Sequence, residues 1–153
     1  MSNQKGFSLV ELLIVVAIIA IIVAIAIPNL LTSRQSAQAS AAAGDLRTIN
    51  SAEIGFAAGP GNGNYGTFTE LENNRMLPGG FSSSGTGYTR NGYTGTLALG
   101  TGNATYTVVS SPANGTISAQ APSYFTDESG AIRFSTSGAA SSTSTPMGQQ
   151  AGS

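Results

Sequence analysis

The 153-residue chain contains no cysteine, no histidine and no tryptophan, and only 8% of its residues are charged. Without cysteine it cannot form a disulfide, and without cysteine and histidine it lacks the usual zinc ligands. Thiol catalysis and a serine–histidine–aspartate relay are excluded for the same reason. We therefore expect a protein that is not an enzyme and that carries no cofactor.

Positive charge is also sparse. The chain has six lysines and arginines against seven acidic residues, which gives a net charge of −1. Scattered charges usually mark a solvated surface, whereas nucleic-acid binding needs basic residues clustered on one face. We expect no direct nucleic-acid binding. The arginines lie far apart, at Arg34, Arg47, Arg75, Arg90 and Arg133.

The dominant feature that is present is an apolar stretch over residues 7–28. A helix over residues 7–27 would be roughly 30 Å long, which is about the thickness of the hydrocarbon core of a bilayer. No small-residue cleavage pattern follows the apolar run, so we expect the segment to be retained rather than removed as an ordinary secretory signal. The sequence predicts a transmembrane helix over residues 7–28.

One acidic residue, Glu11, interrupts this apolar stretch. A carboxylate inside an apolar helix costs about 2.5–3.5 kcal/mol on insertion scales unless it finds a partner. A plain anchor has no use for such a group, so we interpret Glu11 as functional. Its candidate partners are Lys5 and, if the chain is cut after Gly6, the new α-amino group of Phe7 about one helical turn away.

The first 28 residues resemble the class III signal of type IV pilins and of the pseudopilins of type II secretion. The resemblance rests on Lys5-Gly6, the aromatic Phe7, the acid Glu11 and the proline Pro28 in one long apolar helix. It implies that a prepilin peptidase cuts between Gly6 and Phe7 and N-methylates Phe7. It also implies that Glu11 pairs with the Phe7 amine of a neighbouring subunit during filament assembly.

The same resemblance implies how the protein is used. The precursor would sit in the inner membrane, and an assembly platform with cytoplasmic ATPases would build it into an extracellular helical filament for adhesion, twitching motility or DNA uptake. Such a homo-oligomer uses head-to-tail contacts that do not close into a ring. Two alternatives remain open: a type II secretion pseudopilin that forms a short periplasmic filament, and a membrane-anchored binding protein that never polymerises.

The apolar helix should continue beyond the membrane span. A proline removes one backbone hydrogen bond, so we expect the helix to bend at Pro28. Residues 29–58 form an amphipathic continuation in which Leu46, Ile49 and Phe56 recur at helical spacing as a buried stripe. The Gly-Pro-Gly sequence that follows ends the helix.

The remaining chain predicts a small globular part over residues 59–134. Thr67 and Glu70 have the spacing of a capping box, which predicts a short helix to about Met76 within an otherwise irregular segment. Runs rich in Thr, Val, Ile, Tyr and Phe, with an Asn114-Gly115 turn, predict an antiparallel meander of three or four strands. These runs are residues 93–99, 104–110, 116–121 and 123–134.

The predicted fold class is therefore α+β. A long curved N-terminal helix would pack against a small antiparallel sheet, in the lollipop shape that the resemblance to type IV pilins implies. We expect Tyr106, Val108, Ile117 and Phe125 to lie on the sheet face that covers the helix, as a half-buried sheet requires. The predicted organisation is a leader (1–6), a membrane and filament-core helix (7–28), an amphipathic helix (29–58), a globular part (59–134) and a tail (135–153).

Two features of the C-terminal part complete the prediction. Asp127 and Glu128 lie in a turn that supplies fewer oxygens than the six to eight that calcium takes, so we expect an acidic turn there rather than a metal site. Residues 135–153 have no charge and no aromatic residue and are rich in Ser, Thr, Gly and Ala. Such a composition buries too little surface to order itself, which predicts a flexible surface tail.

Overall fold

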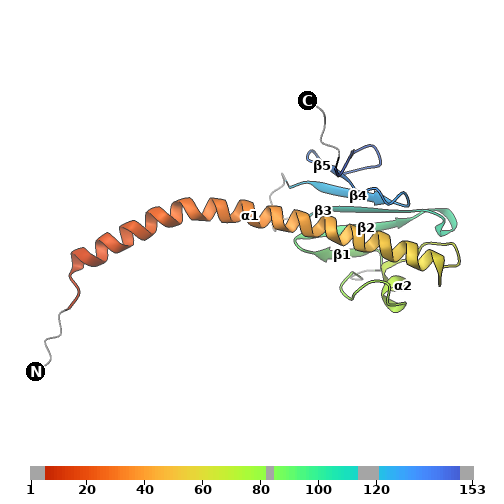
Figure 1. Cartoon of the computed structure of the whole chain (residues 1–153), viewed down its shortest axis with the longest axis horizontal. Helices are drawn as coiled ribbons and strands as arrows, with labels where there is room; N and C mark the ends of the chain where they lie inside the picture. Colours follow the sequence, from red (N-terminus) through yellow and green to blue (C-terminus); the bar gives the residue numbers. More distant parts are fainter. Residues whose placement is uncertain (1–5, 82–84, 114–120, 149–153) are drawn as a thin grey trace, which may run out of the picture. The chain divides into compact units, whose positions relative to one another are not determined.

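A computed structural model describes residues 6–81, 85–113 and 121–148. The chain divides into two compact units, an N-terminal unit of Met1–Ser36 and a C-terminal unit of Ala37–Ser153. Helix α1 (Leu9–Ala58) begins in the first unit and ends in the second. The predicted combination of a long N-terminal helix with an antiparallel sheet is confirmed (Figure 1).

Within the N-terminal unit, α1 continues through Pro28 without a break. The polar side chains that follow the proline bond to the backbone of their own helix. The Asn29 side chain donates to the Ile25 carbonyl at 3.2 Å, and the Thr32 hydroxyl donates to the Pro28 carbonyl at 3.1 Å. These bonds satisfy polar groups next to an apolar segment without a partner from elsewhere. The bend at Pro28 stays a prediction.

Within the C-terminal unit, α1 presents the predicted apolar stripe to the core. Leu46, Ile49 and Phe56 are buried, which confirms the sequence prediction, and alanines beside them allow close approach of the sheet. The same helix also buries three polar side chains, Asp45, Asn50 and Glu53. After α1, the short helix α2 (Phe68–Asn73) begins at Thr67 with the predicted capping box, and it ends before Met76.

The sheet has six antiparallel strands in sequential order. The prediction of three or four strands is therefore too low. The strand over residues 93–99 is confirmed as β2, and the next begins at Tyr106 rather than residue 104 because Thr101–Asn103 form a 3-10 turn. The strands are β1 (Gly87–Arg90), β2 (Tyr93–Leu99), β3 (Tyr106–Pro112), β4 (Ser123–Asp127), β5 (Arg133–Ser135) and β6 (Thr145–Pro146).

Strand β1 was not predicted, although its turn carries a strong local signal. Asn91 and Gly92 join β1 to β2 with positive φ angles of 51° and 78°. Two consecutive residues with positive φ form the tight hairpin turn that Asn-Gly favours. The other Asn-Gly pair, Asn114-Gly115, and most of the predicted strand over residues 116–121, with Ile117, lie outside the described residues.

The sheet register corrects the predicted position of Phe125. Val108 pairs with Thr126, whereas Phe125 pairs with Val109. Paired residues share a face and side chains alternate along a strand, so Thr126 lies on the face of Tyr106 and Val108, while Phe125 lies on the opposite face. The face with Tyr106 and Thr126 is the one that contacts α1, through hydrogen bonds to Asn50.

The segment after Phe134 also differs from the prediction. Of the predicted flexible tail, residues 135–148 are described, and they include strand β6, which pairs with β5. Ala140 is buried, and the Ser123 hydroxyl donates to the Gly138 carbonyl at 2.5 Å. These residues hydrogen-bond at the sheet edge, which composition does not reveal, and the flexibility of the tail stays a prediction. Residues 149–153 lie outside the described part of the chain.

Candidate assembly site

The start of α1 holds Glu11 in one half of a capping box: the Glu11 side chain accepts from the Ser8 N–H, whereas the Ser8 hydroxyl accepts from Val10 rather than from Glu11. The Ser8 backbone N–H donates to Glu11 Oε2 at 2.9 Å, and the Val10 N–H donates to Ser8 Oγ at 3.3 Å. Serine followed three residues later by glutamate is the sequence signature of this motif. The signature is visible in the sequence, and it identifies Ser8 as a site residue that the sequence prediction omitted.

This geometry places the predicted cleavage bond just outside the helix. Gly6 and Phe7 are exposed and precede the first helical residue, Leu9. The Glu11 carboxylate bonds to the N–H of Ser8, which is one peptide away from the nitrogen of Phe7. Glu11 therefore faces the end of the helix where a cut after Gly6 would create an amine. Lys5, the other candidate partner, lies outside the described residues.

The helix of the N-terminal unit exposes an apolar surface from Leu9 to Leu31. Every residue from 6 to 34 is exposed, and Phe7 is 87% exposed. By length and composition α1 can cross a membrane, with a mean hydropathy of 3.3 over its most apolar window. An apolar surface of this extent marks a membrane or protein interaction site. The large exposed side chains are mostly Ile, Leu and Val between Leu9 and Leu31.

Residues 1–27 match the protein family described as Prokaryotic N-terminal methylation motif. The matched residues include Gly6, Phe7, Ser8 and Glu11, so the motif coincides with the capped start of α1. The resemblance to the signal of type IV pilins, predicted from the sequence, is thereby confirmed for the N-terminal segment.

Two curated proteins are similar to part of the chain. The type IV wide pilus major component PilA4 of Thermus thermophilus is 65% identical over 37 residues, which cover 24% of this chain and 28% of the relative. The type IV major pilin protein PilA of Myxococcus xanthus is 43% identical over 54 residues, which cover 35% of this chain and 24% of the relative. The chain thus matches about a quarter of either relative's length, and no solved structure matches it.

In the C-terminal unit, the acidic turn after β4 is organised around Asp127. Asp127 Oδ1 accepts hydrogen bonds from the Ser129 N–H at 3.0 Å and from the Ser129 hydroxyl, and Gly130 completes the turn with a φ of 72°. Within the described residues, no three His, Cys, Asp or Glu side chains come together as metal ligands. The geometry is that of a self-satisfied turn, in which Glu128 is exposed.

A polar centre between α1 and the sheet was not predicted. Asn50 accepts from the Tyr106 hydroxyl at 2.6 Å and from the Thr126 hydroxyl at 3.0 Å, and it donates to the Gly130 carbonyl at 3.1 Å. One side chain thus links the helix to β3, β4 and the acidic turn. In the sequence, the burial of Asn50 is indicated only by its position four residues after Leu46, at the spacing of the buried stripe.

Glu53, one turn further along α1, is completely buried. Its Oε2 accepts from the Gly66 N–H at 3.0 Å, and its Oε1 has no hydrogen-bond partner among the described residues. Burial raises the pKa of Glu53 to about 7; the bond from Gly66 lowers the pKa, and the nearby Glu70 carboxylate raises it. Glu53 stands four residues after Ile49, at the spacing of the buried stripe, which is the signal that could have identified it.

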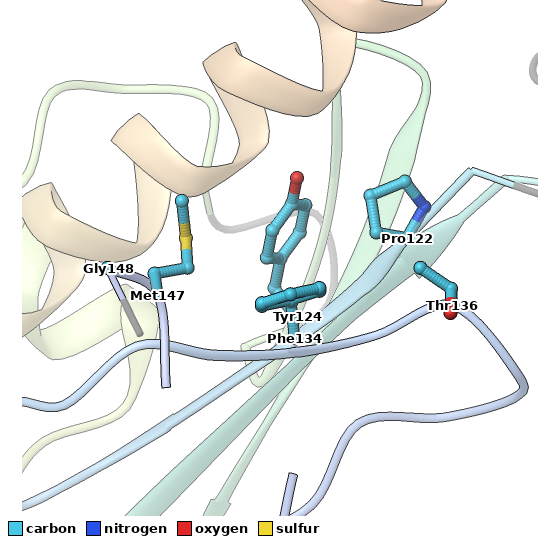
Figure 2. A pocket seen from close by; sticks show the side chains of 6 residues that line it. All are labelled: Pro122, Tyr124, Phe134, Thr136, Met147 and Gly148. Carbon is cyan, nitrogen blue, oxygen red and sulfur yellow. The ribbon is translucent and has the colours of Figure 1, made fainter. Parts of the chain in front are cut away.

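An apolar groove of about 270 Å³ lies along the last strands of the sheet (Figure 2). The rings of Tyr124 and Phe134 and the side chain of Met147 gather along it, and no charged residue lines it. Its chemistry suits an apolar side chain. The lining residues are Pro122, Tyr124, Phe134, Thr136, Met147 and Gly148.

Proposed function

We propose that the protein is a structural subunit of a type IV pilus. The observation that carries the proposal is the exposed apolar helix of the N-terminal unit, which begins with a methylation motif and holds one carboxylate in its first turn. Such a helix is sheltered either by lipid or by the same helix of other subunits. The two curated relatives, each similar to part of the chain, are a type IV pilus component and a type IV pilin.

Processing is the first step of the proposed mechanism. The precursor is held in the inner membrane by α1, and a prepilin peptidase cuts between Gly6 and Phe7 and N-methylates Phe7. The exposed, non-helical position of both residues before Leu9 leaves their peptide bond accessible. Cleavage produces a positive charge beside the negative charge of Glu11, at the end of the helix where a negative group is favoured.

Assembly is the second step. An inner-membrane platform and cytoplasmic ATPases stack the processed helices into a filament core, where Glu11 of one subunit pairs with the Phe7 amine of the next. Breaking a buried ion pair by removing one partner costs about 3–5 kcal/mol, because the remaining charge is left alone. The filament reaches the cell surface and serves adhesion, twitching motility or DNA uptake.

Substitutions of Glu11 test the proposed pairing. Glu11→Gln keeps an acceptor for the Ser8 N–H but removes the charge, whereas Glu11→Ala removes both. We expect both variants to insert into the membrane normally and to lower the filament yield at least about tenfold, as expected for a loss above 1.4 kcal/mol. Membrane fractionation and electron microscopy of sheared filaments measure these quantities. Exposed Glu128→Gln is the matched control and should assemble as the wild type does.

A normal filament yield from Glu11→Gln would show that assembly does not need the charge of Glu11. If Glu11→Ala alone then lowered the yield, the role of Glu11 would be to cap the helix. The intact mass of the mature chain tests processing separately. A chain that begins at methylated Phe7 supports the proposal. An uncut chain that stays monomeric in cells with the whole assembly machinery would favour a membrane-anchored binding protein, and filaments confined to the periplasm would favour a secretion pseudopilus.

A further inference from the structure

The chain that leaves α1 folds back onto the helix end. We call residues 59–66 the return loop. Its first part is held by backbone bonds, with the Gly61 N–H donating to the Phe56 carbonyl at 2.7 Å and the Gly63 N–H donating to the Ala57 carbonyl at 2.8 Å. Its last residue, Gly66, donates its N–H to Glu53 Oε2. The buried carboxyl thus fastens the far end of the loop to the helix.

Two glycines of the return loop lie directly against the Phe56 ring. A Cβ at Gly66 would lie 2.8 Å from Phe56 Cε1, and a Cβ at Gly61 would lie 2.7 Å from Phe56 Cδ1. The backbone therefore covers the ring at a distance that no side chain would allow. Phe56 belongs to the core cluster, so opening the loop would bring water to the end of that core.

Among the described residues, no positively charged group contributes to the pKa of Glu53. The charged group that acts on it is Glu70 of α2, which repels a negative charge, and Glu53 in turn acts on the phenol of Tyr106 on β3. Tyr106 also faces Tyr65 of the return loop, at 4.7 Å between ring centres, as well as the charges of Asp127 and Glu128. The Arg90 guanidinium forms an ion pair with Asp45, at 3.6 Å.

We propose that Glu53 is a proton-controlled latch, which holds the return loop closed over Phe56 when it is protonated and favours release of the loop when it is ionised. A neutral carboxyl is tolerated in this apolar site and still accepts the Gly66 bond. An ionised carboxyl leaves one oxygen of a charged group without a partner in the interior. Opening the loop relieves that cost because water then reaches the carboxylate.

The direction of the pH effect follows from linkage. The closed state holds the Glu53 proton up to a pH of about 7, because its pKa is raised from 4.5 to about 7, while an open, hydrated carboxyl has an ordinary pKa. Loop closure is therefore strongest below pH 4.5 and weakens as the pH rises to about 7, after which it is constant. Full release changes the closing equilibrium by up to about two orders of magnitude over that range.

The test uses the full-length processed protein in detergent micelles. Chymotrypsin cleavage after Tyr65, followed by mass spectrometry from pH 5 to pH 9, reports loop opening, and the amide resonance of ¹⁵N-labelled Gly66 reports the bond to Glu53. Glu53→Gln mimics the protonated state, and its cleavage rate at each pH corrects for the pH dependence of the protease. Glu128→Gln is the control for an exposed acid in the same unit.

We expect the wild-type cleavage rate, relative to Glu53→Gln, to rise at least about tenfold between pH 5 and pH 8, and Glu128→Gln to behave as the wild type. The Gly66 amide resonance should titrate near neutral pH in the wild type and stay constant in Glu53→Gln. Equal profiles for the wild type and Glu53→Gln would overturn the latch. A wild-type Gly66 resonance that does not shift over this range would overturn it independently of the protease.

Discussion

At the scale of single residues, Gly95 on β2 is required by its neighbour. A Cβ at this position would lie 2.0 Å from Tyr88 Cε1. The Tyr88 ring crosses β2 at this point, and its hydroxyl reaches Ser110 Oγ on β3 at 3.2 Å. The rings of Phe68 and Phe81 pack edge-on against Tyr88, so the tyrosine ring cannot move away from a larger residue at position 95.

The substitution Gly95→Ala should therefore destabilise the C-terminal unit by at least about 1–3 kcal/mol, the usual cost of overpacking a well-filled core. Thermal unfolding followed by circular dichroism measures the loss. The control is Gly79→Ala, where a Cβ meets no atom within 4 Å. If the two variants unfolded at the same temperature, the contact between Gly95 and the Tyr88 ring would not be a packing constraint.

At the scale of secondary-structure elements, both helices begin with a hydroxyl residue whose backbone N–H donates to a glutamate three residues later. Ser8 and Glu11 cap α1, and Thr67 and Glu70 cap α2. In α2 the Glu70 carboxylate accepts from the Thr67 N–H at 2.7 Å, and the Glu70 N–H donates to Thr67 Oγ1 at 3.3 Å. A helix of six residues is too short to be stable alone, so α2 depends on this cap and on the burial of Phe68 and Leu71.

Substitution of the cap should loosen α2. We expect Thr67→Ala to cost about 0.5–2 kcal/mol, because the Glu70 N–H then loses its acceptor, and Thr67→Ser to stay near the wild type because serine caps equally well. Hydrogen exchange at the Glu70 amide in the detergent-solubilised protein measures the effect locally. Exchange that is equally slow in Thr67→Ala and the wild type would contradict a stabilising role for the capping box.

At the scale of the whole molecule, the two units differ in whether their apolar residues are exposed or buried. The N-terminal unit exposes its apolar residues, whereas the C-terminal unit has a closed core with buried polar groups that carry specific bonds. In the C-terminal unit, burial raises the pKa of the Glu53 carboxyl to about 7. Its raised pKa makes the stability of that unit depend on pH.

The sign of this dependence is fixed. Between pH 4.5 and about 7 the folded state binds the Glu53 proton more tightly than the unfolded state, so the free energy of unfolding falls as the pH rises through this window. At pH 8 we expect Glu53→Gln to have a higher melting temperature than the wild type. The corresponding difference in the free energy of unfolding is at most on the order of 3 kcal/mol and should vanish near pH 4.5. A melting-temperature difference that is independent of pH would contradict this.

The features that sequence alone determined are those with a local or periodic cause. The apolar span with Glu11, the cap at Thr67 and the buried stripe of Leu46, Ile49 and Phe56 depend on residues within a few turns of one another, and a helix repeats every 3.6 residues. The tight turn at Asn91 also has a local cause, because Asn and Gly adopt positive φ angles through their own residue type.

Tertiary structure decided the rest. Phe125 lies on the opposite face because its pairing with Val109 sets the register, and β6 forms because a segment of small residues meets β5. Glu53 becomes a buried acid because Gly66, thirteen residues away, closes over it. Register and burial depend on partners that are distant in sequence, and no local pattern in the chain specifies which partner will be met.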